Sequence, residues 1–422
     1  MLDINFIREN KDVVKAGALK KRIDIDIDRL IAVDEERRTL RIQMDEKKAE
    51  QNRMSGVIQR AQGDERTALI ERMRHVKDGF AELEEKYNAV MKEWQTLMLG
   101  VPNVPDMTVP EGESDADNQS VKTWGEIPEF PYPLKDHVEL MTKLGMADFE
   151  RGTKVAGFRG YFLRGDGVLL ANAVWQLAIK HFSAKGLEPL LAPSLVRRET
   201  FMGTGYLPQG EEDLYKTQDG EYLAGTAEVA TMGYYMDETL DLQMLPVKFL
   251  AFSPCFRREA GSHGKDVRGL IRVHEFFKWE QVVLCKADHE ESVRTHEWLN
   301  RNTEEFIELL KIPYRTVANC GGDLGLGQVK KYDIELWVPG EKTYREISSA
   351  SYFHDFQTRR LNIRYRDEEG KMRFAHSLNS TAIPTPRILV SIVENYQQED
   401  GTIRVPDALV PYVGKEVLGR PA

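Results

Sequence analysis

The sequence predicts an α+β protein in which a long antiparallel helical arm precedes a mixed domain. Two observations indicate the arm: residues 26–99 are almost free of Gly and Pro, and apolar side chains recur there at alternating spacings of three and four. A third indicates the mixed domain, because from about residue 136 predicted strands and helices alternate without a fixed period. We therefore expect an N-terminal domain at 1–100, a linker at 101–135 and a second domain at 136–422.

Composition narrows the class of protein. The chain has 422 residues, 41% of them apolar, and it contains no long apolar run that could cross a membrane. Its first ten residues, MLDINFIREN, are charged where a signal peptide would be apolar, so we expect a cytoplasmic protein. Cys255, Cys285 and Cys320 form no CxxC pair, which argues against a disulfide framework and a cysteine-rich zinc site.

The two helices of the arm are predicted from their apolar seams. The second seam holds for four heptads and the first is looser, as in an antiparallel coiled coil that turns at Ala61-Gln62-Gly63-Asp64. At about 1.5 Å per residue, each helix would extend roughly 45 to 50 Å, too far to lie along one small domain. The seam positions are Leu30, Val33, Leu40, Met44, Met54 and Ile58, then Leu69, Met73, Val76, Phe80, Leu83, Tyr87, Val90, Trp94 and Leu97.

Charge is distributed unevenly along the arm. Between Arg37 and Lys77 there are eleven basic and six acidic residues, a net charge of +5 in a chain whose total charge is −10. The overall negative charge discourages indiscriminate nucleic-acid binding, so a polyanion would have to meet this local basic surface. The same pattern also fits a solvated coiled-coil face, and charge alone does not separate the two interpretations.

The stretch FSPCFRREAGSHGKDVRGLIRVHEFFKWEQ at 252–281 predicts a hairpin with an oversized loop. We expect one strand through Arg257, a loop from Ala260 to Gly269 that includes the basic Lys265, and a return strand from Leu270 to about residue 284. Hairpin loops usually have two to five residues, so this loop exceeds what chain reversal requires. Alternation places Arg257 and Glu259 on one strand face, and Phe276, Lys278 and Glu280 on one face of the return strand. The pattern suits phosphate and base binding, or else a solvated ribbon with surface ion pairs.

Each of three further stretches could belong to a binding site or interface, or could have a purely structural role. A helix with an apolar stripe from Leu169 to Phe182, followed by the extended LEPLLAPSL, suits an interface or a buried core. In GTAE at 225–228, Thr226 and Glu228 could bind a ligand or cap the next helix. In YREISSASYF at 344–353, the carboxylate and hydroxyls suit Mg²⁺, or an ordinary edge strand.

The stretch FAHSLNSTAIPTPRILVSIVENYQ at 374–397 predicts a strand, a turn and a helix that begins near Pro386. Its buried stripe would comprise Ile388, Leu389, Ile392 and Val393. Arg387 would lie in the first helical turn, where a cation is unfavourable unless a phosphate binds there.

Taken in order, these stretches resemble the motifs of class II aminoacyl-tRNA synthetases, in the form of bacterial-type seryl-tRNA synthetases. The run FRREAGSHGKDVRGLIRVHEF resembles motif 2, with Glu275 where Gln is commoner. The helix and strand that include Pro193 resemble motif 1. The stretch around Arg387 resembles motif 3, although Pro384 and Pro386 stand where small residues are commoner. With the TAE and EISS sequences, the tail VPDALVPYVG and the arm, the likeness covers nearly the whole chain.

The resemblance implies a catalytic domain at 136–422 built on an antiparallel β-sheet flanked by helices, and a homodimer formed through motif 1. It implies that ATP activates L-serine to seryl-adenylate, with Mg²⁺, and that serine is transferred to the 3′ end of tRNA(Ser), and of tRNA(Sec) where present. The N-terminal arm would grip the long variable arm of the tRNA through shape and backbone contacts. No membrane partner is implied.

The resemblance also assigns site residues. Arg257 would hold the α-phosphate, Arg387 the γ-phosphate, and Glu346 and Ser349 the Mg²⁺. Because a serine carboxylate is already ionised at pH 7, activation needs charge neutralisation and not a general base. The implied serine pocket comprises Thr226, Ala227, Glu228, Arg257, Glu280, Asn379 and Thr381. The implied ATP site comprises Arg257, Arg258, Glu259, Val273, Phe276, Glu346, Ile347, Ser348, Ser349 and Arg387, with Phe276 stacked on adenine.

Two other classes of protein share parts of this pattern. A ligase that aminoacylates carrier proteins would keep the catalytic motifs but lack the basic arm. A non-catalytic synthetase-like binding protein would have lost the arginines and Glu346. The sequence has all of these features. Archaeal-type seryl enzymes that hold zinc through cysteine would need a thiolate ligand that these scattered cysteines do not clearly supply.

Overall fold

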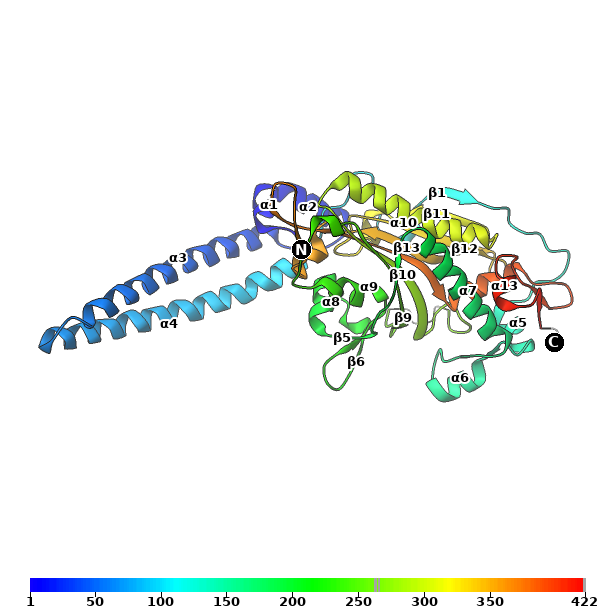
Figure 1. The fold of residues 1–422 in the computed structure, drawn as a ribbon, viewed down its shortest axis with the longest axis horizontal. Helices are drawn as coiled ribbons and strands as arrows, with labels where there is room; N and C mark the ends of the chain where they lie inside the picture. The colour runs from blue at the N-terminus through cyan, green and yellow to red at the C-terminus, as the bar shows by residue number, and fades with distance from the viewer. Residues whose placement is uncertain (262–263, 265, 420–422) are drawn as a thin grey trace. The chain divides into compact units, whose positions relative to one another are not determined.

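The computed structural model describes residues 1–261, 264 and 266–419 (Figure 1). Lys265, expected as a basic loop residue, therefore lies outside the described residues. The chain forms two compact units that divide after Val104. Among the described residues, no helix is both long enough and apolar enough to span a bilayer.

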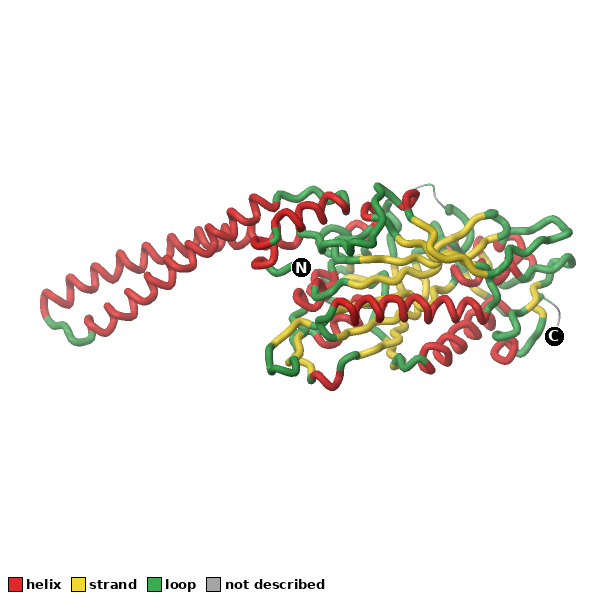
Figure 2. The backbone as a smooth tube through the Cα atoms, turned by 90° about the horizontal axis from the view of Figure 1, so that it is seen from above, coloured by secondary structure: helices red, strands yellow, loops and turns green. Residues whose placement is uncertain are grey.

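The first unit is a helical arm with a small base. Helices α1 (Ile4–Glu9) and α2 (Lys11–Lys20) precede the long α3 (Ile27–Ile58) and α4 (Gly63–Gly100). Figure 2 shows the two long helices side by side, joined by one short turn, so the predicted antiparallel arm is confirmed. Asp26 begins α3 by accepting a hydrogen bond from the amide of Arg29, which satisfies a free helix-end donor. The 32 residues of α3 span about 48 Å.

Apolar contacts hold the arm together at both ends. Leu2, Ile7, Ile27, Leu30 and Met98 are buried at its base. Near the turn, the smaller distal cluster consists of Met54, Met73 and Val76, with Ile58 packed against it. All of these except Leu2, Ile7, Ile27 and Met98 belong to the predicted seams.

The basic residues of the arm are largely exposed. Arg37 is an exception, since it pairs with the buried Asp34 at 2.9 Å and lies over the Trp94 ring, 4.8 Å from its centroid. Arg41 pairs with Asp45, Lys47 pairs with Glu50, and Arg72 approaches Glu50. The other exposed basic residues of this stretch have no ion-pair partner among the described residues, and they are Arg38, Lys48, Arg53, Arg60, Arg66, Arg74 and Lys77.

The second unit is built on an eight-stranded sheet in the order β1-β11-β12-β13-β16-β10-β9-β4. Every neighbouring pair is antiparallel except β4 and β9. Residues 119–124, in the segment expected as a linker, form the edge strand β1. The strands are β1 (Gln119–Trp124), β4 (Glu188–Leu191), β9 (Val247–Phe256), β10 (Glu275–Cys285), β11 (Tyr314–Ala318), β12 (Lys330–Val338), β13 (Thr343–Tyr352) and β16 (His376–Thr385).

Helices cover one face of this sheet and bury its main core. Helix α7 (Asp166–Ala184), α10 (His289–Leu309) and α12 (Arg387–Asn395) contribute Val174, Phe306 and Ile392 to a cluster that includes Trp279 and Leu336 from the strands. The helices predicted from the stripes at 169–182 and 388–393 are thus confirmed. The remaining helices of this unit are α5 (His137–Lys143), α6 (Phe149–Ala156), α8 (Arg198–Thr204), α9 (Ala227–Met232), α11 (Phe356–Arg360) and α13 (Val410–Val413).

Short strands form four small sheets around the large one. The sheet β5-β7-β6, together with α8 and α9, forms a separate apolar cluster beside the ends of β9 and β10. The short strands are β2 (Ala147–Asp148), β3 (Phe162–Leu163), β5 (Leu195–Val196), β6 (Tyr215–Lys216), β7 (Tyr222–Leu223), β8 (Thr239–Leu240), β14 (Arg364–Arg366), β15 (Met372–Phe374), β17 (Ile403–Arg404) and β18 (Val417–Leu418).

The hairpin is present, but its predicted boundaries are wrong. Strand β9 ends at Phe256 and β10 begins at Glu275, so Leu270 is not in the return strand. Gly269 turns the chain at φ +85°, close to His137, where a Cβ would lie 2.2 Å from the ring Nε2. The amide of Leu270 then donates to that Nε2 at 3.2 Å, and Leu270 is fully buried. The apolar residues that suggested a strand are therefore packed into the core as irregular backbone.

Candidate active site

Three adjoining hollows lie over the β9, β10, β13 and β16 strands, and Arg257 and Glu346 line all three. Two of them have volumes of about 420 Å³ and the third, about 60 Å³. We call them the arginine hollow, which includes Arg272 and Arg345, the narrow hollow, which includes Phe276, and the Glu280 hollow. Two residues common to all three make them parts of one site.

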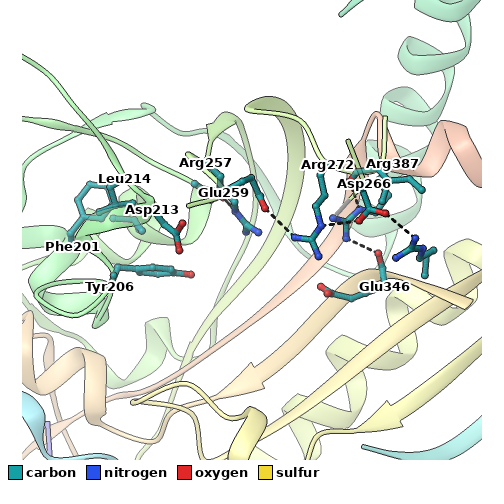
Figure 3. Close-up of a pocket in the computed structure, with 15 residues that line it drawn as sticks. Phe201, Tyr206, Asp213, Leu214, Arg257, Glu259, Asp266, Arg272, Glu346 and Arg387 are labelled. Atoms are coloured by element: carbon teal, nitrogen blue, oxygen red, sulfur yellow. Dashed lines mark hydrogen bonds and ion pairs between the residues drawn. The ribbon is translucent and has the colours of Figure 1, made fainter. Parts of the chain in front are cut away.

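The arginine hollow carries charges of both signs (Figure 3). Arg272 pairs with Glu259 at 3.0 Å and with Asp266 at 2.9 Å, and Asp266 also pairs with Arg345 at 2.8 Å. Together with Arg257 and Arg387, four guanidinium groups face one cavity. A bound polyphosphate would be held by bidentate, charge-assisted hydrogen bonds from such groups.

Arg387 is held by backbone oxygens at the first turn of α12. Its Nη1 donates to the Glu346 carbonyl at 2.7 Å and its Nε donates to the Ile271 carbonyl at 3.1 Å. Burial lowers the pKa of Arg387; Glu346 opposes this effect, and Arg257 and Arg272 add to it. A half-buried cation beside other cations would be stabilised by an anion, which the helix N-terminus also favours.

The narrow hollow has an aromatic wall. The Arg257 guanidinium lies over the Phe276 ring, 5.3 Å from its centroid, and Arg257 Nε donates to the Gly225 carbonyl at 3.3 Å. Ile271, Val273, Ile347 and Pro384 complete an apolar surround. A flat ring could therefore bind between apolar walls while its attached phosphates reach the arginine hollow.

A β-bulge places Glu346 and Ser349 on the same face of β13. Residues three apart in a regular strand point to opposite faces. Here Glu335 of β12 pairs with Glu346 and Ile334 pairs with Ser348, so Ile347 is an extra residue in β13. Both Glu346 and Ser349 consequently line the Glu280 hollow. One carboxylate and one hydroxyl are oxygen donors of the kind that Mg²⁺ accepts when phosphates and water complete its shell.

Asp333 lies beside these two groups, opposite Ser349 on β12. Its Oδ2 accepts a hydrogen bond from Asn319 at 2.7 Å and lies 3.3 Å from the Lys331 ammonium, but its buried Oδ1 has no hydrogen-bond partner within the described residues. Burial raises the pKa of Asp333 to about 6; Lys331 opposes the shift and Glu346 adds to it. The protein thus holds excess negative charge where a cation would bind, which supports a fit to Mg²⁺.

The Glu280 hollow contains a buried ion pair. Lys278 Nζ contacts Glu280 Oε2, and it also donates to Thr381 Oγ1 at 3.4 Å. Thr226 caps α9 and donates its hydroxyl to the same Glu280 oxygen at 3.3 Å. A second bulge, at Ala382, sets Thr381 opposite Glu280, since Trp279 pairs with Ile383 and Glu280 with Thr381.

A second buried carboxylate, Glu228, completes this hollow. Its Oε2 accepts from the Tyr206 hydroxyl at 2.9 Å and its Oε1 accepts from Gln357 Nε2 at 2.7 Å. Burial raises the pKa of Glu228, and the charge of Glu280 adds to the shift. The hollow can therefore hold a small molecule that carries an ammonium and a hydroxyl group.

The structure brings most of the expected residues together. Ala227, Arg258 and Ser348 line none of the three hollows: Ala227 is buried in α9, Arg258 donates to the Glu212 carbonyl, and Ser348 donates to the Thr381 carbonyl. Five lining residues have no role predicted from the sequence, namely Tyr206, Asp266, Arg272, Lys278 and Arg345, and neither has Gln357, which donates to Glu228. The residues assigned from the sequence that do line the hollows are Thr226, Glu228, Arg257, Glu259, Val273, Phe276, Glu280, Glu346, Ile347, Ser349, Asn379, Thr381 and Arg387.

Comparison with known proteins adds independent findings. Residues 1–105 match a family model described as the seryl-tRNA synthetase N-terminal domain, and residues 215–396 match one described as the tRNA synthetase class II core domain (G, H, P, S and T). A serine--tRNA ligase of Deinococcus radiodurans is 46% identical over 423 residues, which covers 100% of both chains.

Two solved structures are similar over almost the whole chain. The seryl-tRNA synthetase from Pyrococcus horikoshii, complexed with ATP, has a TM-score of 0.89 and 38% identity and is matched over 99% of each chain. The cytoplasmic serine-tRNA ligase from Naegleria fowleri, in complex with AMP, has a TM-score of 0.87 and 31% identity, over 99% of this chain and 98% of that one.

Proposed function

The chain belongs to the seryl-tRNA synthetase family, and we infer that it is a serine--tRNA ligase that activates L-serine with ATP and transfers it to tRNA(Ser). One observation supports the assignment of the chemistry to specific residues: Arg257 and Glu346 line all three hollows. We therefore assign the meeting point of the serine carboxylate and the α-phosphate of ATP to the space beside these two side chains.

ATP binding follows from the shapes and charges of two hollows. The base occupies the narrow hollow against Phe276, and the phosphates extend into the arginine hollow. Arg257 neutralises the α-phosphate, and Arg387 neutralises the γ-phosphate at the N-terminus of α12. Arg272 and Arg345 are paired with acidic residues, so phosphates would compete with Asp266 for them.

Serine binding is assigned to the Glu280 hollow. The α-ammonium is placed near Glu228 and Thr226, and the side-chain hydroxyl donates to Glu280 and accepts from Thr381. Its carboxylate then points toward Arg257. Because this carboxylate is already ionised, holding it in line with the α-phosphate is the main contribution of the protein to the first step.

Mg²⁺ fits the bulged strand. Glu346 and Ser349 would hold it, and when bound it would neutralise charge on the phosphate oxygens and the departing pyrophosphate. The bulge at Ile347 supports this assignment, as does Asp333 Oδ1, which has no hydrogen-bond partner among the residues that the structure describes.

The arm is assigned to tRNA. Seven exposed basic residues without ion-pair partners in the described chain form a phosphate-binding surface, whereas the hollows hold the small substrates. Contacts of this kind depend on backbone and shape, so tRNA(Sec) would be accepted where it is present. The use of tRNA and ATP as substrates supports a cytoplasmic location.

A homodimer is supported by apolar side chains that the chain leaves exposed. Leu169 and Ile179 on α7 are 41% and 38% exposed, and Leu191 on β4 is 79% exposed. This helix and strand resemble the motif through which the family forms dimers. Light scattering at micromolar concentration tests the assignment, and a monomer would contradict it.

Serine-dependent exchange between pyrophosphate and ATP tests the function as a whole. We expect exchange with serine alone, charging only when tRNA(Ser) is added, and no charging of a carrier protein. Absence of exchange with serine, with another amino acid active instead, would overturn the assignment of the substrate.

A further inference from the structure

Lys278 has no role in the assignments above, although it lines two of the three hollows. It is 6% exposed and lines both the narrow hollow and the Glu280 hollow. We propose that Lys278 is a specificity-determining residue that makes the pocket select a neutral hydroxyl group and reject an ammonium group of the same size. The proposal rests on the proposed function, because it takes Glu280 as the residue that meets the serine side chain.

The two carboxylate oxygens of Glu280 have different contacts. Lys278 Nζ and the Thr226 hydroxyl both contact Oε2. No described residue donates a hydrogen bond to Oε1, and Glu280 lines the hollow, so Oε1 is the oxygen left for a ligand. Lys278 thus neutralises the carboxylate without occupying the oxygen that a substrate needs.

Lys278 also sets the direction of a second hydrogen bond. An ammonium can only donate, so in its bond to Thr381 Oγ1, at 3.4 Å, the threonine oxygen is the acceptor. The hydroxyl proton of Thr381 is then directed elsewhere, toward the hollow that Thr381 lines. The ligand group must therefore accept from Thr381 and donate to Glu280. A hydroxyl group does both, whereas an ammonium group cannot accept.

The charge of the hollow gives the same preference. Its carboxylates are the buried Glu228 and Glu280 and the exposed Glu346, and its cations are Lys278 and Arg257. Serine brings one ammonium and one carboxylate, which leaves the total charge unchanged. L-2,3-diaminopropionate, which has an amino group in place of the serine hydroxyl, brings a second ammonium that would face Lys278 at low dielectric. Without Lys278, the same ammonium would instead neutralise Glu280.

Substitution of Lys278 tests whether this residue sets the preference for a hydroxyl group over an ammonium group. Lys278→Met keeps the length of the side chain and removes its charge, and Lys278→Arg is the matched control that keeps the charge. We measure kcat/KM for pyrophosphate exchange with serine and with L-2,3-diaminopropionate, at a slightly acidic pH that keeps both amino groups of the probe protonated. Binding of each amino acid is measured separately by thermal shift.

Wild type should prefer serine strongly. In Lys278→Met the ratio of kcat/KM for serine to kcat/KM for the diamine should fall by about 100-fold or more. Binding of the diamine should strengthen, because its second ammonium can then pair with the buried Glu280 carboxylate in place of Lys278. Lys278→Arg should keep the preference. A merely structural lysine would weaken both substrates equally, and an unchanged ratio in Lys278→Met would overturn the proposal. Lys278→Gln provides a second neutral variant if Lys278→Met does not fold, as judged by circular dichroism.

A double variant separates this proposal from the assignment of Glu280. Because the second ammonium of the diamine would face Lys278 directly, adding Lys278→Met to Glu280→Gln should again lower the ratio of the serine and diamine kcat/KM values, by about tenfold or more. An unchanged ratio in that background would overturn the proposal and leave Glu280 as the hydroxyl-binding residue. Unchanged discrimination between serine and alanine in Glu280→Gln would instead contradict the proposed serine pocket itself.

Discussion

Neutralising the arm should separate tRNA binding from amino-acid activation. The perturbation replaces the seven exposed basic residues of the arm by Gln, which favours helices and leaves both apolar seams intact. If about half of them meet phosphates, counterion release predicts that wild-type affinity for tRNA falls roughly 100-fold between 50 and 200 mM salt. The variant should lose most of this dependence and charge tRNA about 100-fold less efficiently near 50 mM salt. The substituted residues are Arg38, Lys48, Arg53, Arg60, Arg66, Arg74 and Lys77.

The assay compares pyrophosphate exchange with tRNA charging over a range of salt concentrations. Exchange should stay at the wild-type rate, because the hollows lie in the other compact unit. Replacing the exposed Lys86 and Lys92 by Gln near the arm base is the matched control and should change charging little. Charging by the seven-residue variant within about twofold of wild type, with the same salt slope, would refute the assignment of the arm surface to phosphates.

Three further changes test single residues. Arg257→Ala should lower kcat for exchange by about 10² to 10³ with a smaller effect on serine KM, because its contact strengthens as charge develops; a rate within a few fold of wild type would remove Arg257 from the α-phosphate. The wild-type ratio of kcat/KM for serine to kcat/KM for alanine should be about 10⁴, and Glu280→Ala should lower this ratio. An unchanged ratio would show that another residue binds the serine hydroxyl. Asp333 has its pKa raised from 3.8 to about 6 in the folded state, so stability is lost as pH rises through this range. Asp333→Asn should remove a loss of up to about 3 kcal/mol in the free energy of unfolding, so its melting temperature should change less between pH 4 and 7 than that of wild type. A pH dependence as steep as that of wild type would contradict this.

Local patterns predicted the arm correctly. Its stability comes from contacts at heptad spacing, such as those of Met73 and Val76, which the sequence displays directly. The hairpin boundary could not be predicted in the same way. Ile271 and Val273 have the apolar alternation of a strand, but they are buried on irregular backbone whose path depends on Gly269 and on His137 from a distant segment.

The candidate site likewise combines features that the local sequence predicts with features that depend on distant segments. Alternation along β10 correctly predicts that Lys278 and Glu280 share a face, since that strand pairs regularly with β9. Tyr206, which follows α8, and Gln357, which lies in α11, both donate hydrogen bonds to Glu228, and the local sequence gives no sign of these contacts. Alternation would also place Glu346 and Ser349 on opposite faces, so their joint assignment depended on resemblance and not on spacing.

The extra residue in β13 has a consequence for insertions and deletions. Removing Ile347, or inserting a compensating residue in β12 beside Glu335, would restore simple pairing and reverse the side of the sheet on which Glu346 emerges. The carboxylate would then be driven toward the face covered by helices, although no proposed ligand had been substituted. Variation in length at this point would therefore abolish activity as completely as loss of the carboxylate itself. Descendants of this gene should tolerate changes of residue type at position 347 far better than changes in the number of residues between the two oxygen donors.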